Sequence, residues 1–310
     1  MIPPATLCPP RRIAAIGTFD GVHLGHRAVV DYLVASGRVR GLVPTVVTFS
    51  SHPLSLVRPE RMPKSLSHLS QRQQRLLDAG VRDVIVLPFD EPLRRMTAHD
   101  FIAMLHDRYG VDAIVLGFNN SFGSDRLRDF EDYVNVAHGV GVDMLQAPRY
   151  EYPGFGEVSS TAIRHLIASG DVATASRLLG HPLSLSGKVV GGQRLGRTIG
   201  FPTANLDIDP ACAIPAEGVY ACRANISGNP QPYQAMVNIG HRPTVDTSIQ
   251  PPLTIEAHLI DFTGDLYGKE ITLDFICRLR PEQKFDSLPS LIAQLRSDRE
   301  ATIHSLQSNS

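Results

Sequence analysis

The sequence has few cysteines and no excess of charge of either sign, and both absences restrict what the protein does. Its four cysteines are far apart, with no C-x-x-C pair and no histidine at ligand spacing: Cys8, Cys212, Cys222 and Cys277. This spacing argues against a zinc site or a disulfide framework. Because 30 Lys and Arg residues balance 31 Asp and Glu residues, we expect no general affinity for nucleic acid, although a local basic pocket remains allowed.

Long apolar runs and internal repeats are also missing. The first residues, MIPPATLCPPRR, are interrupted by four prolines and contain no continuous apolar stretch, so we expect neither a signal peptide nor a membrane anchor. A cytoplasmic protein without a membrane partner is the expectation. Since 310 residues exceed the usual size of one core, two domains are expected, although a single large α/β domain remains possible.

The first half alternates short apolar segments with helical patterns. Nearly uninterrupted apolar strands are typical of a parallel sheet that is covered on both faces, so we predict a βαβ domain with its chemistry at the strand-to-helix turns. The predicted strands are 12–16, 45–49, 83–89, 112–117 and 142–146. The predicted helices are 26–35, 70–79, 98–109 and 130–138, and Thr97 with Asp100 marks the start of the third.

The pattern changes after residue 161. Two short helical segments end at Gly170 and Gly180, and from Ser184 onward short alternating strands are separated by Gly, Pro and Asn turns. Strands at this spacing favour an antiparallel barrel or sandwich, which a last amphipathic helix over about 288–306 covers. We predict two domains, 1–183 and 184–310.

The stretch GTFDGVHLGH, from Gly17 to His26, follows the first strand directly. The chain turns through Gly21 and enters a helix near Gly25, so unpaired helix N–H groups make an anion site there. His23 and His26 can each donate a ring N–H to phosphoryl oxygens, which suits a nucleoside triphosphate. The alternative is one capping and one surface histidine. No G-x-S-x-G or H-E-x-x-H occurs, which favours direct transfer over a covalent intermediate.

This stretch resembles the H-x-G-H signature of nucleotidylyltransferases, and its longer form, G-x-F-D-G-x-H-x-G-H, resembles the bacterial bifunctional flavin synthetases. That family joins a Rossmann-like FMN adenylyltransferase domain to a riboflavin kinase barrel, in the order found here. The resemblance implies catalytic roles for His23 and His26. It also implies that the remaining motif positions bind the ATP phosphates, namely Gly17, Phe19, Asp20 and Gly25.

Three further stretches of the first half resemble the same family. SSTAIR implies that Ser160, Thr161 and Arg164 close over the ATP phosphates; without the resemblance, an N-cap serine and a solvated arginine explain it equally well. TFSSHP implies that His52 lies near the substrates, and GFNNSFG implies that Asn119 contacts the nucleotide and flavin pocket. The chain departs from the pattern at two positions: Ser51 replaces a proline, and Asn120 stands where an aromatic ring is usual.

In the second half, GGQRLGRTIGFPTANL is the densest motif. From Gly191 to Thr198 it is one substitution from a P-loop, but the glycine and proline that follow argue against the helix a P-loop needs. We expect a tight loop that lines a phosphate nest, then an extended segment. The motif resembles the riboflavin kinase signature. It implies phosphate binding by Gly192, Gly196 and Arg197, and Mg²⁺ binding by Thr203 and Asn205, whose hard oxygen atoms suit that ion.

Glu256, in the strand-like LTIEAHLIDF, is the candidate base. Alternation places Thr254, Glu256 and His258 on one polar face, and a solvated strand glutamate is the ordinary explanation. The resemblance implies that Glu256 takes the proton of the riboflavin 5′-hydroxyl as it attacks the γ-phosphate of ATP. In NIGHRPT it implies a substrate contact for Arg242.

The resemblance therefore implies an enzyme that makes FMN and then FAD, with ATP and Mg²⁺ and with riboflavin, FMN and FAD as substrates and products. Three alternatives remain open. The first is a kinase whose first module is weak, regulatory or differently specific, and the second is a nucleotide transfer to another phosphate or acid. The third is a P-loop-like nucleotide-binding switch or nucleic-acid module built on residues 191–198. Small molecules are the expected partners, without nucleic acid or membrane, and a homo-oligomer is left open.

Overall fold

A computed structural model describes residues 10–118, 120–192, 195–241 and 253–308. Contacts between Cα atoms divide the chain into two compact units, Met1–Pro63 with His68–Ser159 and Lys64–Ser67 with Ser160–Ser310. In the described part of the chain, no helix is long and apolar enough to cross a membrane.

The first unit contains a five-stranded parallel sheet in the order β3-β2-β1-β4-β5. Its strands are β1 (Arg12–Ile16), β2 (Val43–Phe49), β3 (Asp83–Leu87), β4 (Val111–Leu116) and β5 (Asp143–Gln146). The order reverses between β1 and β4, and ligands of open parallel sheets bind at such a point, beyond the carboxyl ends of the strands. The predicted parallel sheet is thus confirmed, and the motif from Gly17 to His26 leaves β1 at this edge.

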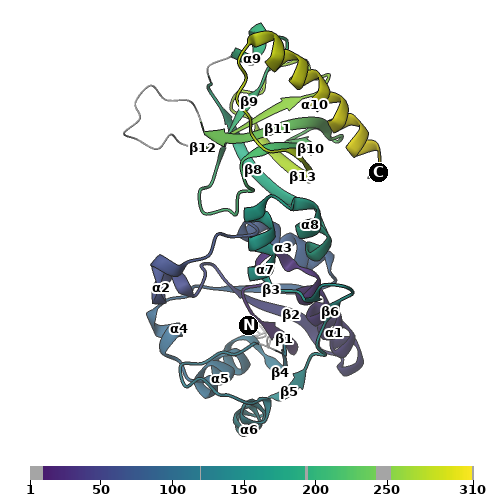
Figure 1. The fold of residues 1–310 in the computed structure, drawn as a ribbon. Coiled ribbons are helices and arrows are strands. Elements are labelled where there is room, and N and C mark those ends of the chain that lie inside the picture. The colour runs from purple at the N-terminus through teal and green to yellow at the C-terminus, as the bar shows by residue number, and fades with distance from the viewer. Residues whose placement is uncertain (1–9, 119, 193–194, 242–252, 309–310) are drawn as a thin grey trace, which may run out of the picture. The chain divides into compact units, whose positions relative to one another are not determined.

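Helices cover both faces of this sheet (Figure 1). The helices α1 (Leu24–Arg40) and α3 (Leu69–Asp78) pack on one face, and α5 (Ala98–Tyr109) and α6 (Phe130–Val140) pack on the other. Thr97 accepts from the N–H of Asp100 at 3.1 Å, which is the predicted start of α5. Short elements that the sequence pattern does not reveal complete the unit: η1 (Asp20–Val22), α2 (Leu54–Val57), η2 (Pro59–Arg61), α4 (Glu91–Arg95), β6 (Glu151–Tyr152) and β7 (Gly156–Glu157).

The second unit contains a closed antiparallel barrel of six strands in the order β10-β11-β12-β9-β8-β13. The strands are β8 (Leu183–Val190), β9 (Ala204–Ile208), β10 (Gly218–Ile226), β11 (Tyr233–His241), β12 (Leu253–Leu259) and β13 (Glu270–Arg280). Closure removes exposed strand edges, and large side chains such as Tyr220 and Phe275 fill the interior. The predicted antiparallel domain is therefore a barrel.

Helices flank the barrel within the same unit. The long helix α10 (Leu288–Ser308) runs beside β10 and β11, as Figure 1 shows. Its buried Asp298 forms a bidentate ion pair with Arg280 at the end of β13, with an Nη2–Oδ2 distance of 2.7 Å. The helices α7 (Ser160–Ser169) and α8 (Val172–Leu179) end at glycines of positive φ, as the sequence predicts.

Contacts place α7 and α8 in the second unit, whereas the predicted division between residues 183 and 184 places them with the first module. The predicted division follows the two expected activities, whereas the two units follow the contacts between residues. The predicted division therefore stays a prediction. The segment Lys64–Ser67 also belongs to the second unit, because Ser65 pairs with Cys212 in a parallel bridge.

Candidate functional site

The turn after β1 is held in an unusual backbone conformation. Phe19 and Val22 have φ values of 48° and 44°, a left-handed region that side chains other than glycine rarely adopt. Both side chains are buried in the core between the sheet and α1, and the N–H of Val22 bonds to the carbonyl of Phe19 at 3.0 Å. Such strain persists only where the surroundings fix it, and it is characteristic of ligand-binding turns.

The two histidines of this turn lie face to face. His23 is the N-cap of α1: its Nδ1 accepts from the N–H of His26 at 3.2 Å. The rings stack with their centroids 3.6 Å apart and 17° between their planes, and Phe19 contacts His26 from the side. Because Nδ1 of His23 is the acceptor, the neutral ring carries its proton on Nε2. The structure thus brings the two predicted catalytic histidines together at the amino end of α1.

The glycines of the motif are needed for packing within the first unit. A Cβ on Gly25 would lie 3.0 Å from the carbonyl oxygen of Val158 and 3.2 Å from the His23 ring. The space that a Cβ on Gly25 would fill is therefore already taken by the chain itself. A Cβ on Gly17 would similarly lie 3.2 Å from the ring of Phe19. Asp20 is buried, with 4% exposed, and lies beside Arg72 of α3.

The structure gives a local explanation for one of the two departures from the family pattern and none for the other. Asn120, where an aromatic ring is usual, donates from its amide to the carbonyl of Ile16 and so ties the loop after β4 to the end of β1. Nothing in the structure explains Ser51. Beyond the end of β2, the ring of His52 accepts from the N–H of Leu54, the first residue of α2, at 3.1 Å. Asn119 lies outside the described residues.

Ser160, Thr161 and Arg164 all lie in the first turns of α7, in the second unit. The Nε of Arg164 donates to the carbonyl of Lys64 at 2.6 Å, which holds the segment Lys64–Ser67. This contact gives Arg164 a structural role that the sequence did not predict.

In the barrel, the predicted metal ligands and the predicted base are neighbours. Asn205 on β9 stands directly opposite Glu256 on β12, and Glu256 stands opposite Asn238 on β11, so the three side chains share one face of the sheet. The hydroxyl of Thr203 donates to Oε2 of Glu256 at 3.3 Å. His258 donates from Nδ1 to the carbonyl of Pro202 at 2.8 Å and fixes the extended segment that carries Thr203.

The glycine-rich loop closes on this cluster. A Cβ on Gly192 would overlap the amide of Asn205, and a Cβ on Gly196 would overlap the carbonyl of Phe201, so both positions require glycine. The helix α9 (Leu195–Thr198) is a single turn that stops before Gly200, where φ is 84°. A P-loop needs a helix that continues from here, so the structure argues against the P-loop alternative.

A cavity of about 80 Å³ opens beside the cluster. Arg197 and Thr203 line it from the glycine-rich loop, Ala257 and Leu259 from β12, and Phe262 and Tyr267 from the loop that follows. The cavity thus combines a cation and a hydroxyl with apolar and aromatic surface, the mixture of groups that lines small-molecule sites. Arg242 lies outside the described residues.

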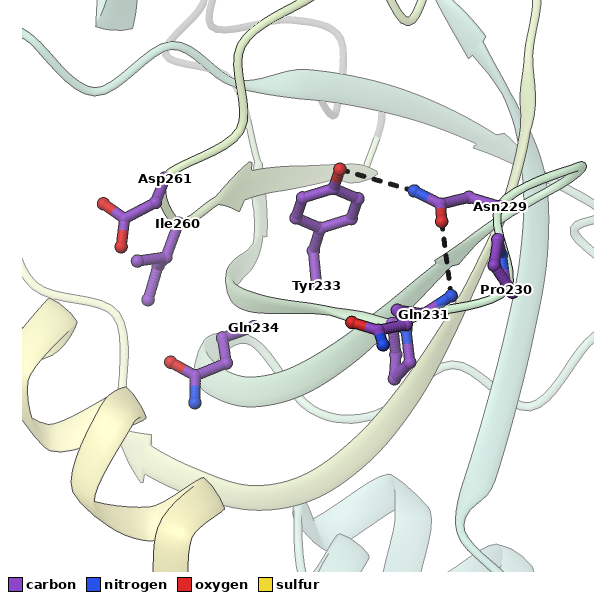
Figure 2. A pocket seen from close by; sticks show the side chains of 8 residues that line it. Asn229, Pro230, Gln231, Tyr233, Gln234, Ile260 and Asp261 are labelled. Atoms are coloured by element: carbon purple, nitrogen blue, oxygen red, sulfur yellow. Dashed lines mark hydrogen bonds between the residues drawn. The ribbon is translucent and has the colours of Figure 1, made fainter.

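A second hollow of the barrel unit, of about 510 Å³, contains none of the predicted residues. It is formed by the turn between β10 and β11 and by the end of β12 (Figure 2). Asn229 donates to the hydroxyl of Tyr233 at 3.3 Å and accepts from the N–H of Gln231 at 3.2 Å. The carboxylate of Asp261 pairs with the guanidinium of Arg299 at 2.8 Å. Amide and proline groups dominate this surface, and the carboxylate among its lining residues is paired with an arginine.

Models of two protein families match different parts of the chain. A model of FAD synthetase matches residues 6–162, and a model of riboflavin kinase matches residues 179–306. A protein of Escherichia coli (strain K12) named bifunctional riboflavin kinase/FMN adenylyltransferase is 38% identical over 287 residues, which are 92% of this chain and 90% of that protein. The chain belongs to this family.

Other members and a solved structure extend the match. The family member of Bacillus subtilis (strain 168) is 31% identical over 94% of this chain and 92% of its own length. A crystal structure described as a macrolide-efflux protein from Streptococcus pneumoniae is 33% identical, with a TM-score of 0.84 over 95% of this chain and 94% of that one. The resemblance inferred from the motifs is therefore confirmed over nearly the whole chain.

Proposed function

We propose that this chain phosphorylates riboflavin to FMN and then transfers the AMP part of ATP to FMN, which yields FAD. Residues 184–310 carry the kinase activity and residues 1–183 carry the adenylyltransferase activity. The observation that supports this best is the grouping of Thr203, Asn205 and Glu256 under a glycine-rich loop, in a barrel whose family includes riboflavin kinases. Small molecules are the partners that this function requires.

In the kinase reaction, Glu256 accepts the proton of the riboflavin 5′-hydroxyl while that oxygen attacks the γ-phosphorus of ATP, and ADP leaves. The loop N–H groups around Gly192 and Gly196 and the guanidinium of Arg197 bind the phosphates. The contact between Thr203 and Glu256 orients the carboxylate at this position. Arg242 supplies a further charged contact to the substrate.

The residues present fit a magnesium ion. Thr203 offers a hydroxyl oxygen and Asn205 an amide oxygen, both hard ligands, beside the carboxylate of Glu256. When bound, Mg²⁺ neutralises the charge that develops on the transferring phosphates. Thr203 and Asn205 hold the ion at this position, and Gly192 leaves room for the amide of Asn205.

In the second reaction, a phosphate oxygen of FMN attacks the α-phosphorus of ATP and pyrophosphate leaves. His23 and His26 donate ring N–H bonds to the phosphate oxygens as their charge spreads. The strained turn with Gly17, Phe19, Asp20 and Gly25 sets the two rings at the amino end of α1. Ser160, Thr161 and Arg164 close over the ATP phosphates, and His52 and Asn119 contact the nucleotide and flavin.

One assay tests both steps. The full chain is incubated with riboflavin, ATP and Mg²⁺, and the flavins are separated by chromatography over time. FMN that rises and then falls as FAD appears supports the proposal. FMN that accumulates without FAD, also when FMN is supplied directly, instead supports a kinase whose first module is weak or regulatory, which the amide at Asn120 in place of a ring favours.

A further inference from the structure

Arg72 is a partly buried arginine that no motif of the sequence singles out. It lies on the inner side of α3, and its Nη1 donates to the carbonyl of Thr18 at 2.7 Å and to the hydroxyl of Thr48 at 3.4 Å. That hydroxyl also donates to the same carbonyl, at 3.2 Å. One guanidinium thus connects the chain just after β1 to the end of β2, at the carboxyl edge of the sheet.

The carbonyl that Arg72 binds is at the start of the strained turn. Thr18 directly precedes Phe19, the first of the two residues with positive φ. A residue other than glycine in this region is strained and needs contacts that fix it. A charged donor on the carbonyl of Thr18 provides such a contact, because charge-assisted hydrogen bonds are the stronger ones.

Arg72 also lies beside a negatively charged residue of the turn. Asp20, inside the motif, is buried, and its carboxylate raises the pKa of Arg72, while burial of the guanidinium lowers it by more. An arginine remains protonated in this setting, so a buried cation sits beside the motif. Its Nε is buried and has no hydrogen-bond partner among the described residues. Leaving a buried donor unpaired is costly, which argues that packing alone does not explain an arginine here.

We propose that Arg72 is a positioning residue for adenylyl transfer: by holding the carbonyl of Thr18 beside Asp20, it fixes the turn that aims His23 and His26 at the phosphates of ATP. The inference rests on the proposed function of the first unit. Arg72 acts through the turn, so its loss displaces the histidines without removing them.

The test compares two variants of Arg72 with a matched control in the full chain. R72M removes the donors at similar length, and R72K keeps a charge and one donor. The control is R12M, because Arg12 is another partly buried arginine of the first unit and lies at the amino edge of the sheet, at the start of β1. Its guanidinium bonds to Asp83 at 3.0 Å and to the carbonyl of Tyr109 at 2.7 Å.

FAD formation from FMN and riboflavin phosphorylation are measured on each preparation, together with thermal stability. We expect R72M to lower kcat for FAD formation by on the order of 100-fold, as displacements of about 1 Å do, with a smaller change in KM for ATP. Riboflavin phosphorylation stays unchanged, and R72K recovers part of kcat. R12M lowers the melting temperature and leaves kcat unchanged.

Two results overturn the inference while leaving the proposed function intact: wild-type kcat in R72M, or a loss of FAD formation in R12M as large as that in R72M at equal stability. If R72M does not fold, the kcat of R72K for FAD formation is the test. A wild-type kcat in R72K would show that the guanidinium is not required and would overturn the inference. A wild-type chain that makes no FAD overturns the proposed adenylyltransferase activity itself, and the role of Arg72 with it.

Discussion

The hydroxyl of Thr203 donates a hydrogen bond of 3.3 Å to the carboxylate of Glu256, although the two residues are 53 positions apart in the sequence. The pairing of Asn205 with Glu256 across β9 and β12 fixes this geometry, because directly opposed residues on neighbouring strands share a face. The proposed base and one proposed oxygen ligand, Asn205, therefore lie on paired strands, and the other proposed ligand directly precedes β9.

Glu256→Gln tests the base. The amide keeps the shape of the side chain but cannot accept the proton, so we expect the rate of riboflavin phosphorylation to fall by roughly 10²–10⁴-fold. Conversion of added FMN to FAD stays unchanged. Glu270→Gln is the matched control, because Glu270 is an exposed glutamate at the start of β13 in the same barrel. Equal rates for Glu256→Gln and Glu270→Gln would show that Glu256 is a solvated strand residue.

Gly192→Ala tests the glycine-rich loop. The added methyl group overlaps the amide of Asn205, so the loop or the proposed ligand must move, and we expect a higher KM for ATP and a lower kcat in the kinase reaction. In Gly191→Ala, a Cβ meets nothing within 4 Å, and this neighbour is expected to behave as the wild type. Initial rates across a range of ATP concentrations compare the two, and the account is contradicted if the two alanine variants cannot be told apart.

His26→Ala tests the stacked pair in the first unit. We expect the rate of FAD formation to fall by about 10²–10³-fold, the range found when a donor to a developing negative charge is removed. Riboflavin phosphorylation continues at the wild-type rate. His99→Ala controls for the loss of an imidazole, since His99 is 60% exposed on α5. FAD production by His26→Ala at the rate of His99→Ala would remove the pair from the mechanism.

Gly25→Ala tests the packing beside the pair. Because the methyl group would press on the carbonyl of Val158 and the ring of His23, we expect lower thermal stability and slower FAD formation. Gly139→Ala is the matched helical control in α6, where a Cβ meets nothing within 4 Å. There alanine raises helix stability by about 0.5–1 kcal/mol. Thermal melts of both variants, with kinase rates as a check on the barrel, decide the outcome.

Local signals predicted much of the fold. Arg12–Ile16 and Ala98–Tyr109 have the predicted bounds, because an apolar run defines the first, and Thr97 and Gly110 define the ends of the second. The helix α1 is longer than predicted, since it begins directly after the His23 cap and continues to Arg40. Short helices such as Leu54–Val57 escaped prediction because a single turn leaves no periodic pattern.

Contacts between distant residues could not be predicted in the same way. Arg72 belongs to a polar helical stretch that is typical of a solvated face, and only the fold brings it to the carbonyl of Thr18. The bridge between Ser65 and Cys212 likewise has no local signal. In contrast, the motifs that place His23 near His26, and Thr203 near Glu256, are informative because backbone turns and strand register determine those contacts.

The most direct test of two separate sites in one chain is a crossed assay of two variants. His26→Ala and Glu256→Gln are each incubated with ATP and Mg²⁺, once with riboflavin and once with FMN, and the flavin products are separated. The account predicts that His26→Ala converts riboflavin to FMN and stops there, whereas Glu256→Gln leaves riboflavin unchanged and converts FMN to FAD. Loss of both conversions in both variants, or FAD formed from riboflavin at the wild-type rate in either, would contradict it.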